Sequence, residues 1–249
     1  MNPSQTILLT GSSGLLGSKI KLSGSFSNLL TPSRNELDIT NQESINKYFF
    51  NNKFEVIIHA AALARMGECE KFPHNAIEVN TVGTANIVNN VLQEEIRQKK
   101  FIRFVYVSTD GVYESISGGY SENSATQPYN VYGWTKLGGE CSVRSLANYC
   151  IIRTRFFDPA NIPYESSASD IITSSIEINR LIQIIGKLIN INFSGIVNVG
   201  DKAMTEYTRY KKYKPSLNPC LRADLVKILN YEIAHDSSMN LSLLKKLIG

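Results

Sequence analysis

The sequence of 249 residues has little of what marks a secreted, metal-binding or membrane-spanning protein. It contains four cysteines, and none of them forms a Cys-x-x-Cys pair or lies near a histidine at the spacing of a zinc site. No apolar run approaches the roughly 18 residues that a membrane span requires, and no signal segment opens the chain. We therefore expect a cytoplasmic protein with free thiols, no metal site and no membrane partner.

Charge is nearly balanced, because 26 Lys and Arg residues face 22 Asp and Glu residues. A net charge of +4 suits anionic small molecules and does not by itself indicate nucleic-acid binding. Residues 205–214 interleave tyrosines with basic side chains, which is typical either of a single-strand-binding surface or of an amphipathic surface helix beside a substrate site. We favour the helix, so no nucleic-acid partner is expected.

Near the N-terminus, an apolar run at 7–10 is followed by glycines at three-residue spacing. Gly11 permits a sharp turn, Gly14 lets a pyrophosphate approach the backbone, and Gly17 lets the following helix pack closely on the strand. Negative charge is favoured at such a helix N-terminus. The pattern fits a dinucleotide site, although a structural turn in an unrelated α/β protein has the same spacing. The candidate cofactor residues in this segment are Gly11, Ser13, Gly14, Leu15, Leu16 and Gly17.

The segment 28–34 is interpreted as a second strand and its exit, and it ends in Ser33 and Arg34, where an NAD site would carry an acidic residue. A hydroxyl and a guanidinium suit a ribose 2′-phosphate, so the sequence favours NADP(H), with NAD(H) as the alternative. Arg34 can also be read as a solvated loop charge. Asp38-Ile39 is a candidate adenine-binding pair, but Asp38 or Thr40 could equally cap the helix expected in 41–52.

A buried strand at 54–58 ends in His59 and three alanines, Ala60, Ala61 and Ala62, whose small side chains permit close approach of a cofactor. Nothing nearby completes a catalytic triad with His59, so we interpret it as a packed histidine at a strand end.

The third group of candidates follows a predicted helix at 73–93, which contains Asn80, and a predicted strand at 101–107. Thr109 comes just after that strand, and hydroxyls at the carboxyl ends of parallel strands point into the ligand crevice. Tyr132 and Lys136 are spaced to share one face of a helix that continues to Asn148. A nearby ammonium favours the phenolate and eases proton transfer by the tyrosine.

These segments, together with 79–84 and 120–122, resemble the extended short-chain dehydrogenase/reductase superfamily, and within it the dTDP-4-dehydrorhamnose reductase group of nucleotide-sugar reductases. The resemblance covers the first two thirds of the chain. It implies a Rossmann-type, doubly wound parallel α/β sheet with a small C-terminal substrate-binding lobe.

The resemblance also assigns roles. It implies that Tyr132 donates a proton, Lys136 tunes that tyrosine and binds the nicotinamide ribose, and Thr109 hydrogen-bonds the substrate carbonyl. Asn80 matches the asparagine that supports the lysine through water. Gly111 stands where related dehydratases carry glutamate and epimerase-reductases carry cysteine, so simple reduction of a nucleotide-linked 4-keto-6-deoxy sugar is favoured over both.

The last third of the chain is less informative. We expect a cofactor domain at 1–155 and a lobe at 156–249, with 195–200 returning as a strand to the main sheet. The lobe looks shorter than in typical members of the family, which keeps a non-catalytic regulatory subunit open beside a 4-epimerase. By analogy with the superfamily, we expect a homodimer.

Overall fold

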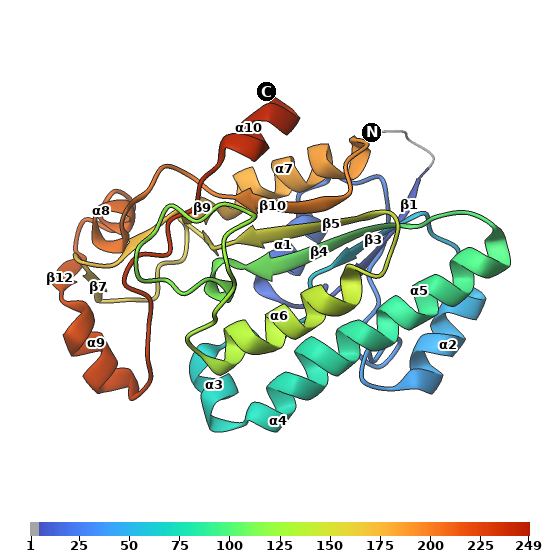
Figure 1. Cartoon of the computed structure of the whole chain (residues 1–249), viewed down its shortest axis with the longest axis horizontal. Helices are drawn as coiled ribbons and strands as arrows, with labels where there is room; N and C mark the ends of the chain where they lie inside the picture. The colour runs from blue at the N-terminus through green and yellow to red at the C-terminus, as the bar shows by residue number, and fades with distance from the viewer. Residues whose placement is uncertain (1–4) are drawn as a thin grey trace.

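A parallel sheet of six strands forms the centre of the computed structural model, which describes residues 5–249 (Figure 1). The strand order is β10-β5-β4-β3-β1-β2, so the chain moves outward in both directions from β1. Between β1 and β3 the order reverses, and in such sheets the crevice at the carboxyl ends binds ligands. The bounds are β1 (Thr6–Thr10), β2 (Asn28–Leu30), β3 (Val56–His59), β4 (Arg103–Thr109), β5 (Tyr149–Thr154) and β10 (Gly195–Val199).

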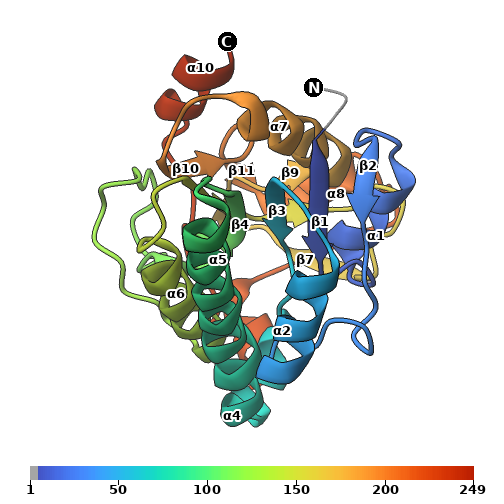
Figure 2. The same cartoon turned by 90° about the vertical axis from the view of Figure 1, so that its right-hand side faces the viewer.

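Helices cover both faces of this sheet, as a doubly wound fold requires (Figure 2). On one face α1 (Leu15–Leu22) and α7 (Ile178–Asn190) share an apolar core with the strands. On the other face lie α2 (Gln42–Asn51), α5 (Thr84–Gln98) and α6 (Val131–Val143). The expected Rossmann-type α/β class is therefore confirmed.

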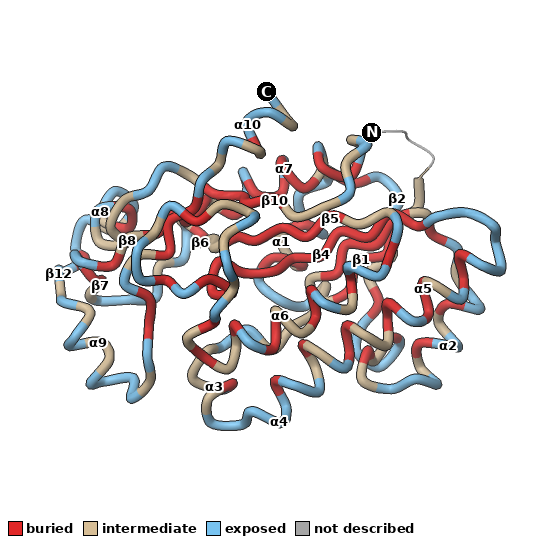
Figure 3. The backbone as a smooth tube through the Cα atoms, in the orientation of Figure 1, coloured by how far each residue is buried: buried red, intermediate tan, exposed pale blue. Residues whose placement is uncertain are grey.

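Burial explains why these segments fold as they do. All seven residues of β4 are buried, as expected for a parallel strand covered on both faces (Figure 3). Helix α7 buries Ile178, Leu181, Ile182 and Ile185, whose spacing of three and four residues places them on one side. Each such side chain contributes about 1.5–3 kcal/mol through burial.

Several boundaries differ from the sequence-based expectation. The strand predicted at 101–107 lies two residues later, because Phe101 is exposed before the strand begins. Helix α6 begins six residues before Leu137 and ends at Val143. The single helix predicted at 73–93 is α4 (Pro73–Ala76), a π-helical segment η1 (Ile77–Gly83) and then α5. Such π segments often accompany functional sites.

Most of the remaining short elements build a lobe beside the carboxyl ends of the strands, whereas α10 packs against α7 and β10, and α3 packs against α4 and α6 (Figure 1). The strands of the lobe form three short pairs, β6 with β9, β7 with β12 and β8 with β11. Helix α8 is the amphipathic helix expected within 205–214. None of the helices in residues 5–249 has the length and apolar character needed to cross a membrane. The other bounds are α3 (Met66–Lys71), η2 (Asp110–Val112), β6 (Phe156–Phe157), β7 (Ser166–Ala168), β8 (Ile172–Thr173), β9 (Ile176–Glu177), β11 (Met204–Thr205), α8 (Glu206–Lys211), β12 (Asn218–Cys220), α9 (Arg222–Leu229) and α10 (Ser242–Ile248).

Candidate active site

The glycine turn between β1 and α1 is built so closely that side chains would not fit. Gly11 has φ of 72°, and a Cβ there would lie 2.6 Å from the backbone nitrogen of Ala61. A Cβ on Gly17 would lie 2.1 Å from the carbonyl oxygen of Gly11. Gly14 occupies the N-cap position of α1, and no side chain caps that end. The first N–H groups of α1 are therefore left for an external anion.

A cavity of about 220 Å³ lies against this turn. Its wall combines the turn with the segments that follow β2 and β3, which the strand order brings together at one edge of the sheet. Among the predicted cofactor residues, those that line it are Gly11, Ser13, Gly14, Arg34, Asp38, Ile39, Ala60, Ala61 and Ala62. Those outside its lining are Leu15, Leu16, Gly17, Ser33, Tyr132 and Lys136.

The polar groups of the segment after β2, in and beside the cavity, are paired with one another. Arg34 is 76% exposed, and its Nε donates to Asp38 at 3.2 Å. Ser33 donates through its N–H and its hydroxyl to one oxygen of Glu36, at 2.8 and 2.7 Å. These two bonds lower the pKa of the Glu36 carboxyl. A 2′-phosphate here would meet the Arg34 guanidinium, but also two carboxylates.

The expectation that Asp38 or Thr40 caps α2 is wrong. Asn41 is the N-cap, because its side chain accepts from the N–H of Ser44. Asp38 instead closes a short turn by accepting from the backbone and hydroxyl of Thr40.

Thr109 and Tyr132 meet at the carboxyl end of β4. The Thr109 hydroxyl accepts from the N–H of Gly111 at 3.1 Å. Tyr132 lies in the first turn of α6. The N-cap of this helix is Asn130, whose side chain accepts from the N–H of Gly133. Burial raises the pKa of the Tyr132 phenol well above its usual range, Asp110 adds to this, and a hydrogen bond with Thr109 opposes it. The phenol is therefore held in its protonated form.

Lys136 lies one helical turn after Tyr132 and is only 1% exposed. Its ammonium sits 4.0 Å from the centre of the Tyr106 ring. Burial lowers the pKa of Lys136 to about 7, and the Glu140 carboxylate opposes this shift. The group therefore changes charge near neutral pH.

Asn80 connects the segment after β3 to α6. Its side chain exchanges two hydrogen bonds with the backbone of Leu63, at 2.8 and 3.0 Å, and donates to the Thr135 hydroxyl at 3.0 Å. Thr135 precedes Lys136 in α6, so Asn80 ties the segment after Ala62 to the helix that carries the lysine.

His59 is buried and hydrogen-bonded on both nitrogens, to Thr10 at 2.7 Å and to Thr84 at 3.1 Å. The Thr84 hydroxyl gives its own hydrogen to the Asn80 carbonyl, so it accepts from Nε2 of His59. Burial lowers the pKa of His59 to about 3 and keeps the ring neutral. The interpretation of His59 as a packed histidine is confirmed.

Sequence reasoning did not single out the charged groups next to Thr109. Asp110 and Arg155 directly follow β4 and β5, whose register pairs Thr109 with Thr154. Charged residues just past the ends of neighbouring parallel strands were a signal that could have identified them.

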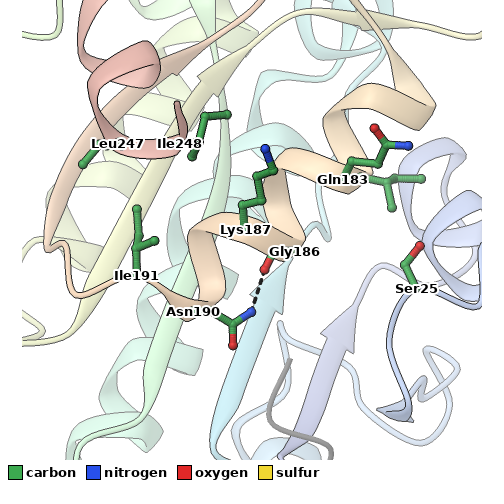
Figure 4. A pocket seen from close by; sticks show the side chains of 9 residues that line it. Ser25, Gln183, Gly186, Lys187, Asn190, Ile191, Leu247 and Ile248 are labelled. Carbon is green, nitrogen blue, oxygen red and sulfur yellow. Dashed lines mark hydrogen bonds between the residues drawn. The ribbon is translucent and has the colours of Figure 1, made fainter.

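A second cavity is lined by none of the predicted catalytic or cofactor-binding residues. It measures about 690 Å³ and lies between α7, α10 and the segment after α1 (Figure 4). Its wall is largely aliphatic, and Asn190 there donates to the Gly186 carbonyl of its own helix. Among residues 5–249, no three His, Cys, Asp or Glu side chains gather as a metal ion would require.

Comparison with known proteins agrees with this geometry. The model of the RmlD substrate binding domain family matches residues 5–158. The dTDP-4-keto-6-deoxy-D-glucose reductase of Streptomyces niveus is 32% identical over 142 residues, which are 56% of this chain and 47% of that protein. Methionine adenosyltransferase 2 subunit beta of Mus musculus is 29% identical over 150 residues, covering 57% of this chain and 43% of that protein. The matched segment thus spans less than half the length of these curated relatives.

Structural similarity extends further than sequence similarity. The crystal structure of dTDP-4-dehydrorhamnose reductase from Bacillus anthracis in complex with NADP superposes with a TM-score of 0.85 at 22% identity. The superposition covers 97% of this chain and 92% of that chain, so it includes the lobe as well as the main sheet. Since the family model matches more than half of its residues, the chain belongs to the RmlD substrate binding domain family.

Proposed function

We propose that this protein is a reductase that uses NADPH to reduce a nucleotide-linked 4-keto-6-deoxy sugar. One observation carries the proposal: the uncapped N-terminus of α1 and the Tyr132–Thr109 pair both lie at the carboxyl ends of the strands of one sheet. An anion-binding turn and a proton donor at one edge suit a dinucleotide and a carbonyl substrate.

The cavity at the glycine turn suits the adenosine and pyrophosphate part of a dinucleotide. The missing side chains of Gly11 and Gly17 keep the turn tight, and the first N–H groups of α1 would hold a pyrophosphate. Arg34 and Asp38 would face the adenosine half, with Arg34 supporting the choice of NADPH over NADH. Lys136 would hold the nicotinamide ribose. When bound, NADPH supplies the hydride.

The chain itself supplies the proton. Reduction of a ketone places negative charge on its oxygen, and a positioned phenol neutralises that charge by donating its hydrogen. Tyr132 is protonated in this site, as its raised pKa requires, and Thr109 lies beside it as a second hydroxyl. A positive charge on Lys136 favours the phenolate that remains.

A second candidate function is that of a non-catalytic subunit that binds NADP(H). The similarity to methionine adenosyltransferase 2 subunit beta favours it. The grouping of Thr109, Tyr132 and Lys136 favours turnover, because a binding subunit has no need of a proton donor.

The proposal includes a cellular location and a biosynthetic role. All four cysteines are free, which suits a cytoplasmic location, and reduction of nucleotide-linked keto sugars suits deoxysugar or polysaccharide synthesis. We place the protein there as a homodimer with a nucleotide-diphosphate sugar as its substrate.

The test is NADPH oxidation against a panel of nucleoside-diphosphate 4-keto-6-deoxy sugars, comparing the parent protein with Tyr132→Phe. We expect kcat to fall by about 10²–10⁴-fold in the variant, since general acid catalysis contributes that much. NADPH affinity should stay unchanged, as followed through the fluorescence of Trp134, the single tryptophan of the chain.

Tyr149→Phe serves as the matched control, because Tyr149 is the first residue of β5 and lies at the amino ends of the strands, away from the site at their carboxyl ends. A Tyr132→Phe variant that turns over like its parent would disprove the proton-donor role. Binding of NADPH without oxidation by any sugar would support the non-catalytic subunit instead.

A further inference from the structure

Asp110 joins three segments that are far apart in the sequence, and its partner Arg155 reaches a fourth. One of its oxygens accepts from the Thr109 hydroxyl at 3.2 Å. The other accepts from Arg155 Nε and from the Ser237 hydroxyl, both at 2.7 Å. Arg155 also reaches Glu206 at 3.5 Å, at the start of α8 in the lobe. The carboxylate of Asp110 is thus shared between the end of β4, the end of β5 and the C-terminal segment.

Because Asp110 is buried, its carboxylate needs partners that compensate its charge. The Asp110 side chain is 1% exposed, and Arg155 is 21% exposed. A buried carboxylate is tolerated when it is paired and hydrogen-bonded, and it relocates or takes up a proton when its partner is lost. The position of Asp110, and with it the bond to Thr109, therefore depends on Arg155.

The consequence falls on the reacting groups. Besides its hydrogen bond with Tyr132, the Thr109 hydroxyl accepts from the N–H of Gly111 and donates to the carboxylate of Asp110. Tyr132 lies next to that hydroxyl, and both Asp110 and Arg155 are close enough to influence its phenol. A shift of Asp110 would move the pair that has to face a carbonyl oxygen.

We propose that Arg155 is a positioning residue, which acts through Asp110 to hold the Thr109 hydroxyl beside Tyr132 and which couples this geometry to the lobe through Glu206. This inference rests on the proposed reductase function. Arg155 and Asp110 lie beside Thr109 and outside the lining of the cavity at the glycine turn, so we expect the substitution to affect the reaction more than binding of the cofactor half that this cavity holds.

The main experiment compares Arg155→Met with the parent enzyme and with Arg180→Met. Arg180 forms an ion pair with Asp201 at the surface, which makes it a matched control away from the site. We expect kcat of Arg155→Met to fall by about a hundredfold, the cost of a displacement of about 1 Å at a reacting group, with KM for NADPH within about twofold of the parent. Arg155→Lys keeps the charge and one bond to Asp110, so its kcat should be intermediate.

Exchange of the Gly111 amide hydrogen supplies a readout that does not need turnover. This N–H donates to the Thr109 hydroxyl, so it should exchange faster in Arg155→Met and at the parental rate in Arg180→Met. Should the Met variant not fold, the Lys variant takes its place in both measurements.

The outcomes separate this inference from the proposed function. A parental kcat in Arg155→Met overturns the inference and leaves the reductase intact. Faster exchange confined to residues 206–211, with Gly111 unchanged, shows a purely structural contact and overturns it too. If none of the sugars supports NADPH oxidation by the parent, the proposed function fails, and the exchange rate of the Gly111 amide alone then decides. Faster exchange in Arg155→Met supports the positioning role, and unchanged exchange overturns it.

Discussion

At the scale of single residues, the neutral state of His59 links the cofactor edge of the sheet to acid stability. Its ring is fully buried between two threonine hydroxyls and stacks on Tyr106 with centroids 5.7 Å apart. Burial holds its pKa near 3, whereas an unfolded chain has the ordinary value near 6.5. The folded protein therefore excludes a proton that the unfolded chain takes up.

The sign of the resulting pH dependence follows from that difference. Above pH 6.5 neither state is protonated, and the contribution of His59 is fully present; it is lost as the pH falls toward 3, by roughly 1.4 kcal/mol per pH unit. We expect His59→Gln to reduce the slope of unfolding free energy against pH between 4 and 6, measured by urea denaturation. His74→Gln, at an exposed histidine, should keep the parental slope. Equal slopes in all three proteins would contradict the assignment.

At the scale of elements, the sequence predicted what depends on local spacing. Glycines at 11, 14 and 17 predicted the turn, and the spacing of Tyr132 and Lys136 placed both in α6. The contacts of Asp110 depend on the register of β4 with β5 and on the position of Ser237, which comes from a distant part of the chain. No local sequence pattern encodes either of them. The π-helical segment 77–83 was missed for a similar reason, because it carries Asn80, whose side chain contacts the backbone of Leu63 in another segment.

Two helical glycines test how tightly the first turn is built. In Gly17→Ala the new methyl group would lie 2.1 Å from the Gly11 carbonyl oxygen, so the turn has to open. We expect a loss of about 1–3 kcal/mol of stability from overpacking, together with weaker NADPH binding. Gly186→Ala, in α7, meets nothing nearer than Phe26 at 3.9 Å and should gain about 0.5–1 kcal/mol from helix propensity. Urea denaturation and Trp134 fluorescence measure the two effects; similar behaviour of both variants would contradict the close packing.

At the scale of the whole molecule, buried polar groups fasten the last strand of the sheet to α6, to the loop after β4 and, through the Asn240 carbonyl, to the C-terminal segment. The Arg153 guanidinium pairs with Glu140 of α6 and donates to the Tyr113 hydroxyl, which in turn donates to Asn198 of β10. Asn198 also donates to the Tyr120 carbonyl. Sheet, α6 and the loop after β4 therefore share one network, which ties the residues around 113–122 to the last strand.

Such a network predicts that the chain unfolds as one unit. Asn198→Ala removes the acceptor of Tyr113 and one of the two donors to the Tyr120 carbonyl, which keeps the N–H of Asn240, at an expected cost of about 3 kcal/mol. For a chain of this size that lowers the melting temperature by roughly 6–12 °C. Asn190→Ala is the control, because Asn190 is exposed and bonds only to the carbonyl of Gly186 in its own helix. Calorimetry should show a single transition in all three proteins, shifted only in Asn198→Ala; two transitions, with one of them unmoved, would mean that the lobe folds independently of the sheet.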